Sequence, residues 1–132
     1  MARIFLVEDD LCTHLALKAV LKSKSHEVVG SADNAMEATA SILSLKPDLC
    51  LIDVHLTGSS SGFDVAEFIL AKVEIPIIIM SGNNYPTLPL PFILKPFTVE
   101  HLMLALDRAL RTCTRIKPLV LAGFRVRQAV VR

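Results

Sequence analysis

Short apolar runs separated by helical segments constrain the fold of this chain more than any other feature of its sequence. Five runs have the length of β-strands, and they lie at residues 3–8, 27–32, 49–52, 76–80 and 92–94. Apolar spacing and helix-stop signals predict four helices, at residues 11–24, 35–46, 63–73 and 99–112. Strands that alternate with helices favour an α/β fold with a parallel sheet covered on both faces, because right-handed crossovers connect parallel strands.

The last of these helices carries clear signals at its start and along one face. Thr98 precedes it, with a hydroxyl that can cap the free backbone N–H groups of the first turn. The helical spacing of its apolar residues predicts that Leu102, Leu106, Ala109 and Leu110 point into the core.

The connection between the fourth and fifth strands, residues 82–91, breaks the alternation. It contains Pro86, Pro89 and Pro91, which disfavour a regular helix. An extended connection of this length spans about 33 Å, enough to return along a strand of about 17 Å. We therefore predict a stiff, polyproline-like strap in place of the fourth crossover helix. The alternative interpretation is a PxxP ligand for a protein partner.

Length and composition indicate one compact domain. The chain has 132 residues, of which 52% are hydrophobic, so it can bury a genuine core. No apolar run reaches the roughly 18 residues of a membrane span, and the acidic Glu8 comes too early for a secretory signal. The three cysteines are odd in number and form no CxxC pair, which favours reduced thiols. We expect a cytoplasmic protein without membrane association.

The charge distribution divides the chain at residue 112. Residues 1–112 hold all 13 acidic residues and 9 of the 14 Lys and Arg residues, a net charge of −4. Residues 113–132 hold the other five basic residues and no acid, a net charge of +5. We expect a domain over 1–112 and a basic tail over 113–132. A disordered or loosely docked tail is the first interpretation, followed by a protein-contact segment and by weak nucleic-acid contact. DNA binding is not supported, because the tail has no recognition motif.

Polar and charged residues follow the predicted strands where each one ends. Glu8 and Asp9 follow the first strand, Asp53 the third, Ser81 the fourth and Lys95 the fifth. Ligands of parallel sheets bind beyond these carboxyl ends. Clustered carboxylates repel each other unless a cation joins them, and Mg²⁺ prefers such oxygen ligands. Asp53 is then a candidate nucleophile on phosphorus, with Lys95 and Ser81 as candidate partners of the phosphoryl oxygens.

Four motifs at these strand ends resemble the receiver domain of response regulators in two-component signalling. They are LVEDD at 6–10, PDLCLIDVHL at 47–56, IIIMSG at 77–82 and FILKPF at 92–97. The resemblance covers residues 3–112, and the combination of motifs in this order is its most specific part. It implies a flavodoxin-like, doubly wound sheet of five parallel strands in the order 2-1-3-4-5. The strap departs from the family, because the fourth helix is shortened or missing there.

The resemblance also implies a metal and phosphorylation site. Asp53 would be the phospho-acceptor and a ligand of Mg²⁺. Asp9 would bind the ion directly, Glu8 through water, and His55 through its backbone carbonyl.

A conformational switch is implied beside that site. Lys95 would bind the phosphoryl group, and the hydroxyl of Ser81 would follow it. Phe92, three residues before the lysine, would be the aromatic switch. The Lys95–Pro96 peptide bond would be cis, as it is in the family.

The function that the resemblance implies is transfer of a phosphoryl group to Asp53 from a phosphohistidine of a sensor histidine kinase or histidine phosphotransfer protein. Such a domain is a switch rather than an enzyme, since it promotes only its own phosphorylation and dephosphorylation. Leu11 and Leu15 of the first helix, flanked by His14 and Lys18, would contact the donor. Output would pass to a downstream protein partner, and a homodimer is left open.

Three other classes of protein share parts of this pattern. A haloacid dehalogenase-type phosphatase would need a second acid where the chain has His55. A flavodoxin-like FMN carrier would need a glycine- and hydroxyl-rich phosphate loop, where the chain has acidic residues after the first strand. A pseudo-receiver, which keeps the fold as a binding module without the switch, is compatible with the departures from the family.

Overall fold

The computed structural model describes residues 1–112 and 116–131 of the chain. Its strands are β1 (Arg3–Val7), β2 (Glu27–Ala32), β3 (Leu49–Asp53), β4 (Ile77–Ser81) and β5 (Phe92–Leu94). Its helices are α1 (Leu11–Ser23), α2 (Ala35–Leu45), α3 (Gly62–Lys72), α4 (Val99–Arg111) and α5 (Pro118–Val131). None of the helices in the described part of the chain has the length and hydrophobicity needed to span a membrane.

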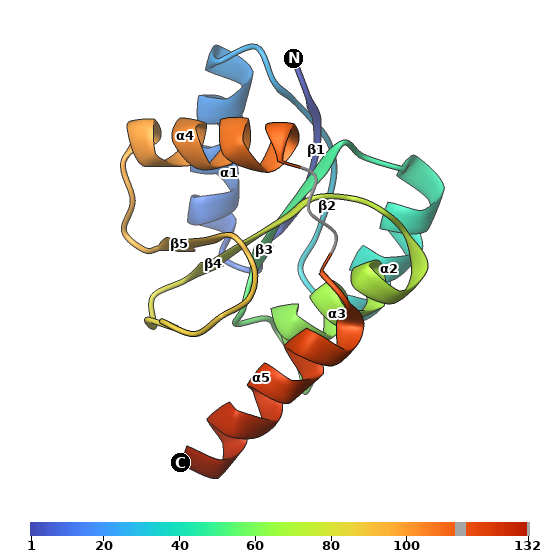
Figure 1. The fold of residues 1–132 in the computed structure, drawn as a ribbon. Helices are drawn as coiled ribbons and strands as arrows, with labels where there is room; N and C mark the ends of the chain where they lie inside the picture. Colours follow the sequence, from blue (N-terminus) through green and yellow to red (C-terminus); the bar gives the residue numbers. More distant parts are fainter. Residues whose placement is uncertain (113–115, 132) are drawn as a thin grey trace.

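The five strands form one parallel sheet in the order β2-β1-β3-β4-β5, which confirms the predicted flavodoxin-like topology (Figure 1). The chain begins at the centre and moves outward in two directions, so β1 and β3 are neighbours. Loops after these two central strands therefore diverge, and they leave a site at the carboxyl edge of the sheet.

The side chains of the central strands alternate between two separate cores. Ile4 and Leu6 of β1 pack with α1 and α4, whereas Phe5 and Val7 pack with α2 and α3. The strands are buried on both faces, as β3 shows with five buried residues in succession. This burial explains why the strands read as continuous apolar runs rather than as alternating patterns.

The predicted helix signals agree with the structure in most details. Thr98 caps α4 by accepting a hydrogen bond from the backbone N–H of His101 at 3.1 Å. Leu102, Leu106 and Ala109 are buried as predicted. The prediction for Leu110 was wrong, because its side chain is 37% exposed. Leu110 lies one position after Ala109, so the rotation of the helix carries it away from the sheet.

The strap over residues 82–91 contains bends and a turn but no helix, and the structure describes all of these residues. The absence of the fourth crossover helix is therefore confirmed. A fully extended strap was the wrong expectation, because the backbone N–H of Leu88 donates to the carbonyl of Tyr85 at 3.1 Å and closes a turn. Leu90 is buried at the end of the strap, where the chain enters β5.

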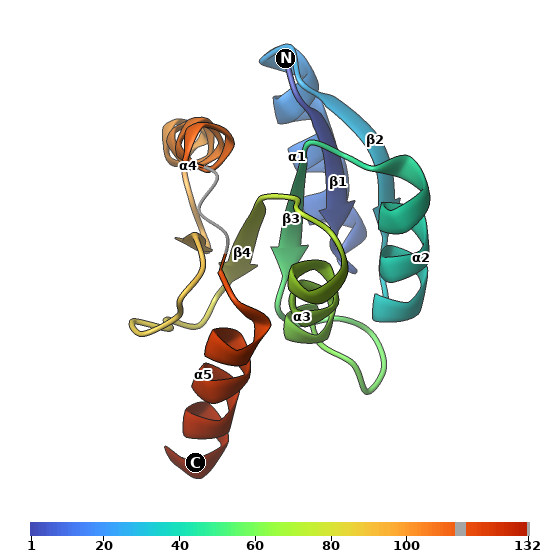
Figure 2. The same cartoon turned by 45° about the vertical axis from the view of Figure 1, so that its right-hand side comes forward.

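The expectation of a disordered or loosely docked tail was also wrong over residues 118–131. These residues form α5, which lies beside α3 in both views (Figures 1 and 2). Leu121 and Phe124 of α5 are fully buried in the core on the α2–α3 face. Residues 113–115 and 132 of the predicted tail lie outside the described residues.

Helix α5 covers the face of the sheet that the fourth crossover helix would have covered. The chain moves in the same direction from β3 to β4 and from β4 to β5, so right-handed crossovers put both connecting helices on one face. That face is the one covered by α3. The C-terminal helix thus fills, from outside the sheet's own connections, part of the space that the strap leaves.

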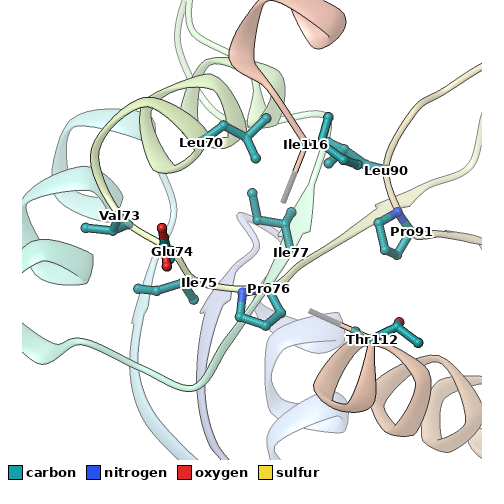
Figure 3. Close-up of a pocket in the computed structure, with 11 residues that line it drawn as sticks. Leu70, Val73, Glu74, Ile75, Pro76, Ile77, Leu90, Pro91, Thr112 and Ile116 are labelled. Atoms are coloured by element: carbon teal, nitrogen blue, oxygen red, sulfur yellow. The ribbon is translucent and has the colours of Figure 1, made fainter. Parts of the chain in front are cut away.

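A cavity of about 140 Å³ lies at the opposite edge of the sheet from the strand ends that carry the acids (Figure 3). Ile77 at the start of β4, Leu90 and Pro91 of the strap, and Ile116 before α5 line it. The lining is mostly apolar, and the packing between the strap and the neighbouring helices is therefore incomplete at this point.

Candidate functional site

The parallel register brings the predicted site residues to one edge of the sheet, which we call the carboxylate edge: Glu8, Asp9, Asp53, Ser81 and Lys95. Asp53 is paired with Met80 on β4, so its side chain and that of Ser81 follow neighbouring positions. Ser81 is in turn paired with Leu94, directly before Lys95. Residues as far apart as positions 8 and 95 are thereby collected at one place.

Lys95 joins the two buried carboxylates of this edge. Its Nζ donates to Asp53 Oδ2 at 2.6 Å and to Glu8 Oε2 at 2.9 Å. The Glu8 and Asp53 side chains are only 1% and 7% exposed, whereas the Lys95 side chain is 24% exposed. The ammonium group therefore supplies the positive charge that two neighbouring buried carboxylates require.

The environment of the pair shifts the proton affinities of its members. Burial raises the pKa of Glu8 above its usual value, and the neighbouring Asp53 adds to this effect, although Lys95 opposes it. Burial by itself would lower the pKa of Lys95, but the contacts with Asp53 and Glu8 outweigh burial and raise it. A charged Lys95 between the two acids is thus the favoured arrangement.

The same edge has a donor set that fits a divalent cation. Carboxylate oxygens of Glu8, Asp9 and Asp53 lie within 4.8 Å of one another. Asp9 is exposed, and its Oδ2 accepts a hydrogen bond from Thr57 Oγ1 at 3.2 Å. Hard oxygen ligands with one exposed member suit Mg²⁺, which keeps several of its waters when it binds proteins.

His55 and Asn83 flank the exposed mouth of the carboxylate edge. The backbone N–H of His55 donates to Asp53 Oδ1 at 3.0 Å, and its Nε2 lies 3.2 Å from Asn83 Nδ2. The metal-binding role of the His55 carbonyl stays a prediction. Asn83 was not singled out from the sequence, because an asparagine after Ser-Gly is typical of an ordinary turn.

The two predicted switch residues are held by contacts away from Asp53. Ser81 is fully buried, and its Oγ accepts a hydrogen bond from the backbone N–H of Asn83 at 3.0 Å. The half-buried ring of Phe92 packs edge-on against Tyr85, with the ring centroids 6.1 Å apart. The Lys95–Pro96 peptide bond is cis, as the resemblance implied.

Gly62 is a further residue on which the position of Asp53 depends. A Cβ atom at this position would lie 2.0 Å from the backbone oxygen of Asp53. The N–H of Gly62 donates to the carbonyl of Val54 at 2.8 Å, which brings the start of α3 directly against the end of β3. The sequence showed Gly62 only as the last residue of a flexible loop, so its close approach went unnoticed.

The predicted donor-contact residues of α1 are exposed. The side chains of Leu11 and Leu15 are 67% and 55% exposed, respectively. Beside them, a groove between α1 and α4 is lined by Ala16 and Phe97 among others, and it reaches Lys95. An apolar surface thus leads directly to the carboxylate edge.

Similarity to known proteins agrees with this geometry. Residues 4–107 match the model of the family described as the response regulator receiver domain. The chain is 27% identical over 115 residues to the transcriptional regulatory protein PdtaR of Mycobacterium tuberculosis, a match over 81% of this chain and 56% of the relative. The chain therefore spans about half the length of the curated relatives that it matches.

Solved structures show the same fold. The signal receiver domain of a modulated diguanylate cyclase from Desulfovibrio desulfuricans superposes with a TM-score of 0.78 and 25% identity, over 86% of this chain and 96% of that one. The response regulator PhyR from Brucella abortus gives 0.75 and 30%, over 83% of this chain and 48% of the other. The family match extends over most of the sheet and its helices, and the chain belongs to the response regulator receiver domain family of two-component systems.

Proposed function

We propose that this receiver domain accepts a phosphoryl group on Asp53 in a Mg²⁺-dependent reaction and thereby changes its contacts with other proteins. The observation that carries the proposal is the carboxylate edge itself. Asp53 is 5% exposed, it lies with Glu8 and Asp9 in one acidic cluster, and Lys95 contacts it directly. Receiver domains in general are signalling modules without an enzymatic activity toward other substrates.

Asp53 would act as the nucleophile in the transfer. A carboxylate oxygen attacks the phosphorus of a phosphohistidine, the P–N bond breaks as the new P–O bond forms, and the imidazole leaves. The donor would be a sensor histidine kinase or a histidine phosphotransfer protein. Its approach would use the exposed Leu11 and Leu15 beside the carboxylate edge.

Glu8, Asp9 and Asp53 would hold Mg²⁺, with the His55 carbonyl as a further ligand. When bound, the ion neutralises charge on the phosphoryl oxygens and draws the acidic side chains together. The ammonium of Lys95 would turn from Glu8 toward the phosphoryl group, because a bound cation relieves Glu8 of the need for it.

Ser81 and Phe92 would report the modification. The Ser81 hydroxyl, now an acceptor for the Asn83 N–H, would donate to a phosphoryl oxygen. A shift of this segment biases the position of Phe92 in an equilibrium that already exists. The resulting surface would bind a downstream protein, in the cytoplasm, and a homodimer is left open.

Labelling with a small phosphodonor such as acetyl phosphate tests the proposal. The wild-type chain should gain one phosphoryl mass in the presence of Mg²⁺ and none after chelation, and Asp53→Asn should abolish the gain. Asp33→Asn is the matched control, because Asp33 follows β2 at the same edge of the sheet but lies outside the acidic cluster. Equal labelling of the wild type and Asp53→Asn, or no labelling of the wild type, would favour a pseudo-receiver that only binds partners.

A further inference from the structure

Helix α5 is held on the domain by a small surface that we call the α5 seat: Phe63, Asp64 and Glu67 of α3, with Tyr85 of the strap. The ring of Phe124 is fully buried there. Its centroid lies 5.8 Å from that of Phe63 and 6.0 Å from that of Tyr85, both in edge-on geometry. The seat therefore recognises an aromatic side chain of a helix through two rings from separate segments.

An acidic pair completes the α5 seat beside these rings. Arg125 Nη1 lies 3.1 Å from Asp64 Oδ1 and 3.0 Å from Glu67 Oε1. The guanidinium also lies 5.8 Å from the centroid of the Phe63 ring. A planar guanidinium can pair with carboxylates and stack on a ring at once, which a lysine ammonium does less well. The seat thus selects arginine directly after an aromatic residue.

The occupant presents these groups on one side of a helix. Leu121, Phe124 and Arg125 stand at positions i, i+3 and i+4, so they share a face. Leu121 and Phe124 are fully buried, whereas Leu119 and Val126 are 81% and 63% exposed. The ligand of the seat is therefore a basic helix with an apolar residue, an aromatic residue three positions later, and an arginine next to it.

The α5 seat is organised by contacts that do not involve α5. Asp64 Oδ2 accepts the backbone N–H of Ser61 at 2.6 Å, as part of the capping box that starts α3. Tyr85 also packs on Phe63 at 5.5 Å and on Phe92 at 6.1 Å. Helix α5, in contrast, has 14 residues, a length at which an isolated helix is only marginally stable in water. The occupant can therefore leave while the seat keeps its shape.

We propose that the α5 seat is a docking site for a basic amphipathic helix of a partner protein, and that α5 is a built-in competitor for it. The charge distribution supports this choice of ligand, since residues 1–112 carry a net charge of −4 and residues 113–132 one of +5. The proposal goes beyond phosphorylation of Asp53 and does not depend on it.

A binding experiment with the full chain tests the proposal. The probe is a fluorescent synthetic peptide with the sequence of residues 116–132. The double variant Phe124→Ala/Arg125→Glu, which weakens the built-in occupant, should bind the peptide about tenfold or more tighter than the wild type, because an occupied seat lowers apparent affinity. The control Val126→Ala/Arg127→Glu changes exposed residues of the same helix and should bind like the wild type. Equal binding by all three chains would overturn the proposal.

A charge exchange identifies the surface that the peptide occupies. The peptide with Arg125→Glu should bind the double variant weakly, and adding Glu67→Arg to that chain should restore its binding. Glu67 is the residue to change, because Asp64 also caps α3. Binding that is indifferent to Glu67→Arg would place the peptide elsewhere and refute the seat.

Hydrogen exchange of the wild-type chain gives an independent test that needs no variant. If α5 leaves its seat, its amides should exchange faster than those of α3 and α4, through a local opening. Exchange of α5 only at the rate of global unfolding would show a permanent structural helix and would contradict the proposal.

Discussion

The carboxylate edge and the opposite end of the signalling path, the strap with α5, are built by different means. At the carboxylate edge, four consecutive strand ends place Glu8, Asp53, Ser81 and Lys95, so sheet topology fixes the site. At the strap, no crossover helix follows β4, and a helix from the C-terminal segment covers that face of the sheet. Chemistry restricts the first region to particular side chains, whereas the second needs only an apolar cover, which another segment can supply.

Replacing Lys95 by methionine should have the largest effect and should be confined to the carboxylate edge. The change leaves Glu8 and Asp53 buried without their cation, and loss of one partner of such a pair costs about 3 kcal/mol of unfolding free energy. Addition of Mg²⁺ should recover much of this loss, because the ion replaces the missing charge. Denaturant unfolding with and without Mg²⁺ measures both effects.

Lys72→Met, at the exposed end of α3, is the control and should change stability by less than about 0.5 kcal/mol. A Lys95→Met chain as stable as the wild type without Mg²⁺ would show that the lysine is not needed to balance the two acids.

Gly62→Ala should also strongly destabilise the domain, since the new Cβ would meet the backbone of Asp53. Forcing an atom into a packed contact costs about 1–3 kcal/mol, and the upper end applies here because the neighbour is backbone. Gly82→Ala, where nothing lies within 4 Å of the new Cβ, should leave the melting temperature nearly unchanged. Calorimetry of the two variants compares them directly; similar melting temperatures would contradict the close approach at Gly62.

Tyr85→Ala probes the strap. It removes ring contacts to Phe63, Phe92 and Phe124, and we expect a loss of about 2 kcal/mol from three such pairs. Hydrogen exchange should show weaker protection of α5, while Mg²⁺ affinity at the carboxylate edge stays as in the wild type. Tyr85→Phe keeps the ring and should keep the protection. A parallel fall in Mg²⁺ affinity would mean that the two regions are not separable.

Ser61→Ala should have the smallest effect. Ser61 accepts a hydrogen bond from the N–H of Phe63 and, together with Asp64, forms the capping box of α3. Loss of such a cap costs about 1 kcal/mol. Ser60→Ala, an exposed neighbour, is the control. Because α3 begins at the carboxylate edge and also carries the α5 seat, a fall in both Mg²⁺ affinity and α5 protection would identify α3 as the element that connects them.

The carboxylate edge could be predicted from the sequence because its signal is local. Each of Glu8, Asp53, Ser81 and Lys95 directly follows an apolar run, and parallel pairing then brings the ends together. The missing helix was equally visible, since the prolines of the strap act on the backbone of their own segment.

The α5 seat could not be predicted in this way because its contacts join distant segments. Nothing near Phe63, Tyr85 or Phe124 in the sequence indicates that their rings meet. The basic residues of the tail indicated solvent exposure, yet Arg125 is paired with Asp64 and Glu67. The spacing of Leu121 and Phe124 was the available signal for a helix, and charge content outweighed it in the prediction.

A crossover helix is anchored at both ends by strands, whereas α5 is joined to α4 only through residues 112–117. Such a short tether keeps a ligand at an effective concentration on the order of millimolar around its own site. A partner present at about micromolar concentration would then need roughly a thousandfold greater intrinsic affinity to displace α5 from half of the molecules. The length of this connection would therefore set a threshold for output, and changing it would tune which partners respond without altering a single residue of the α5 seat.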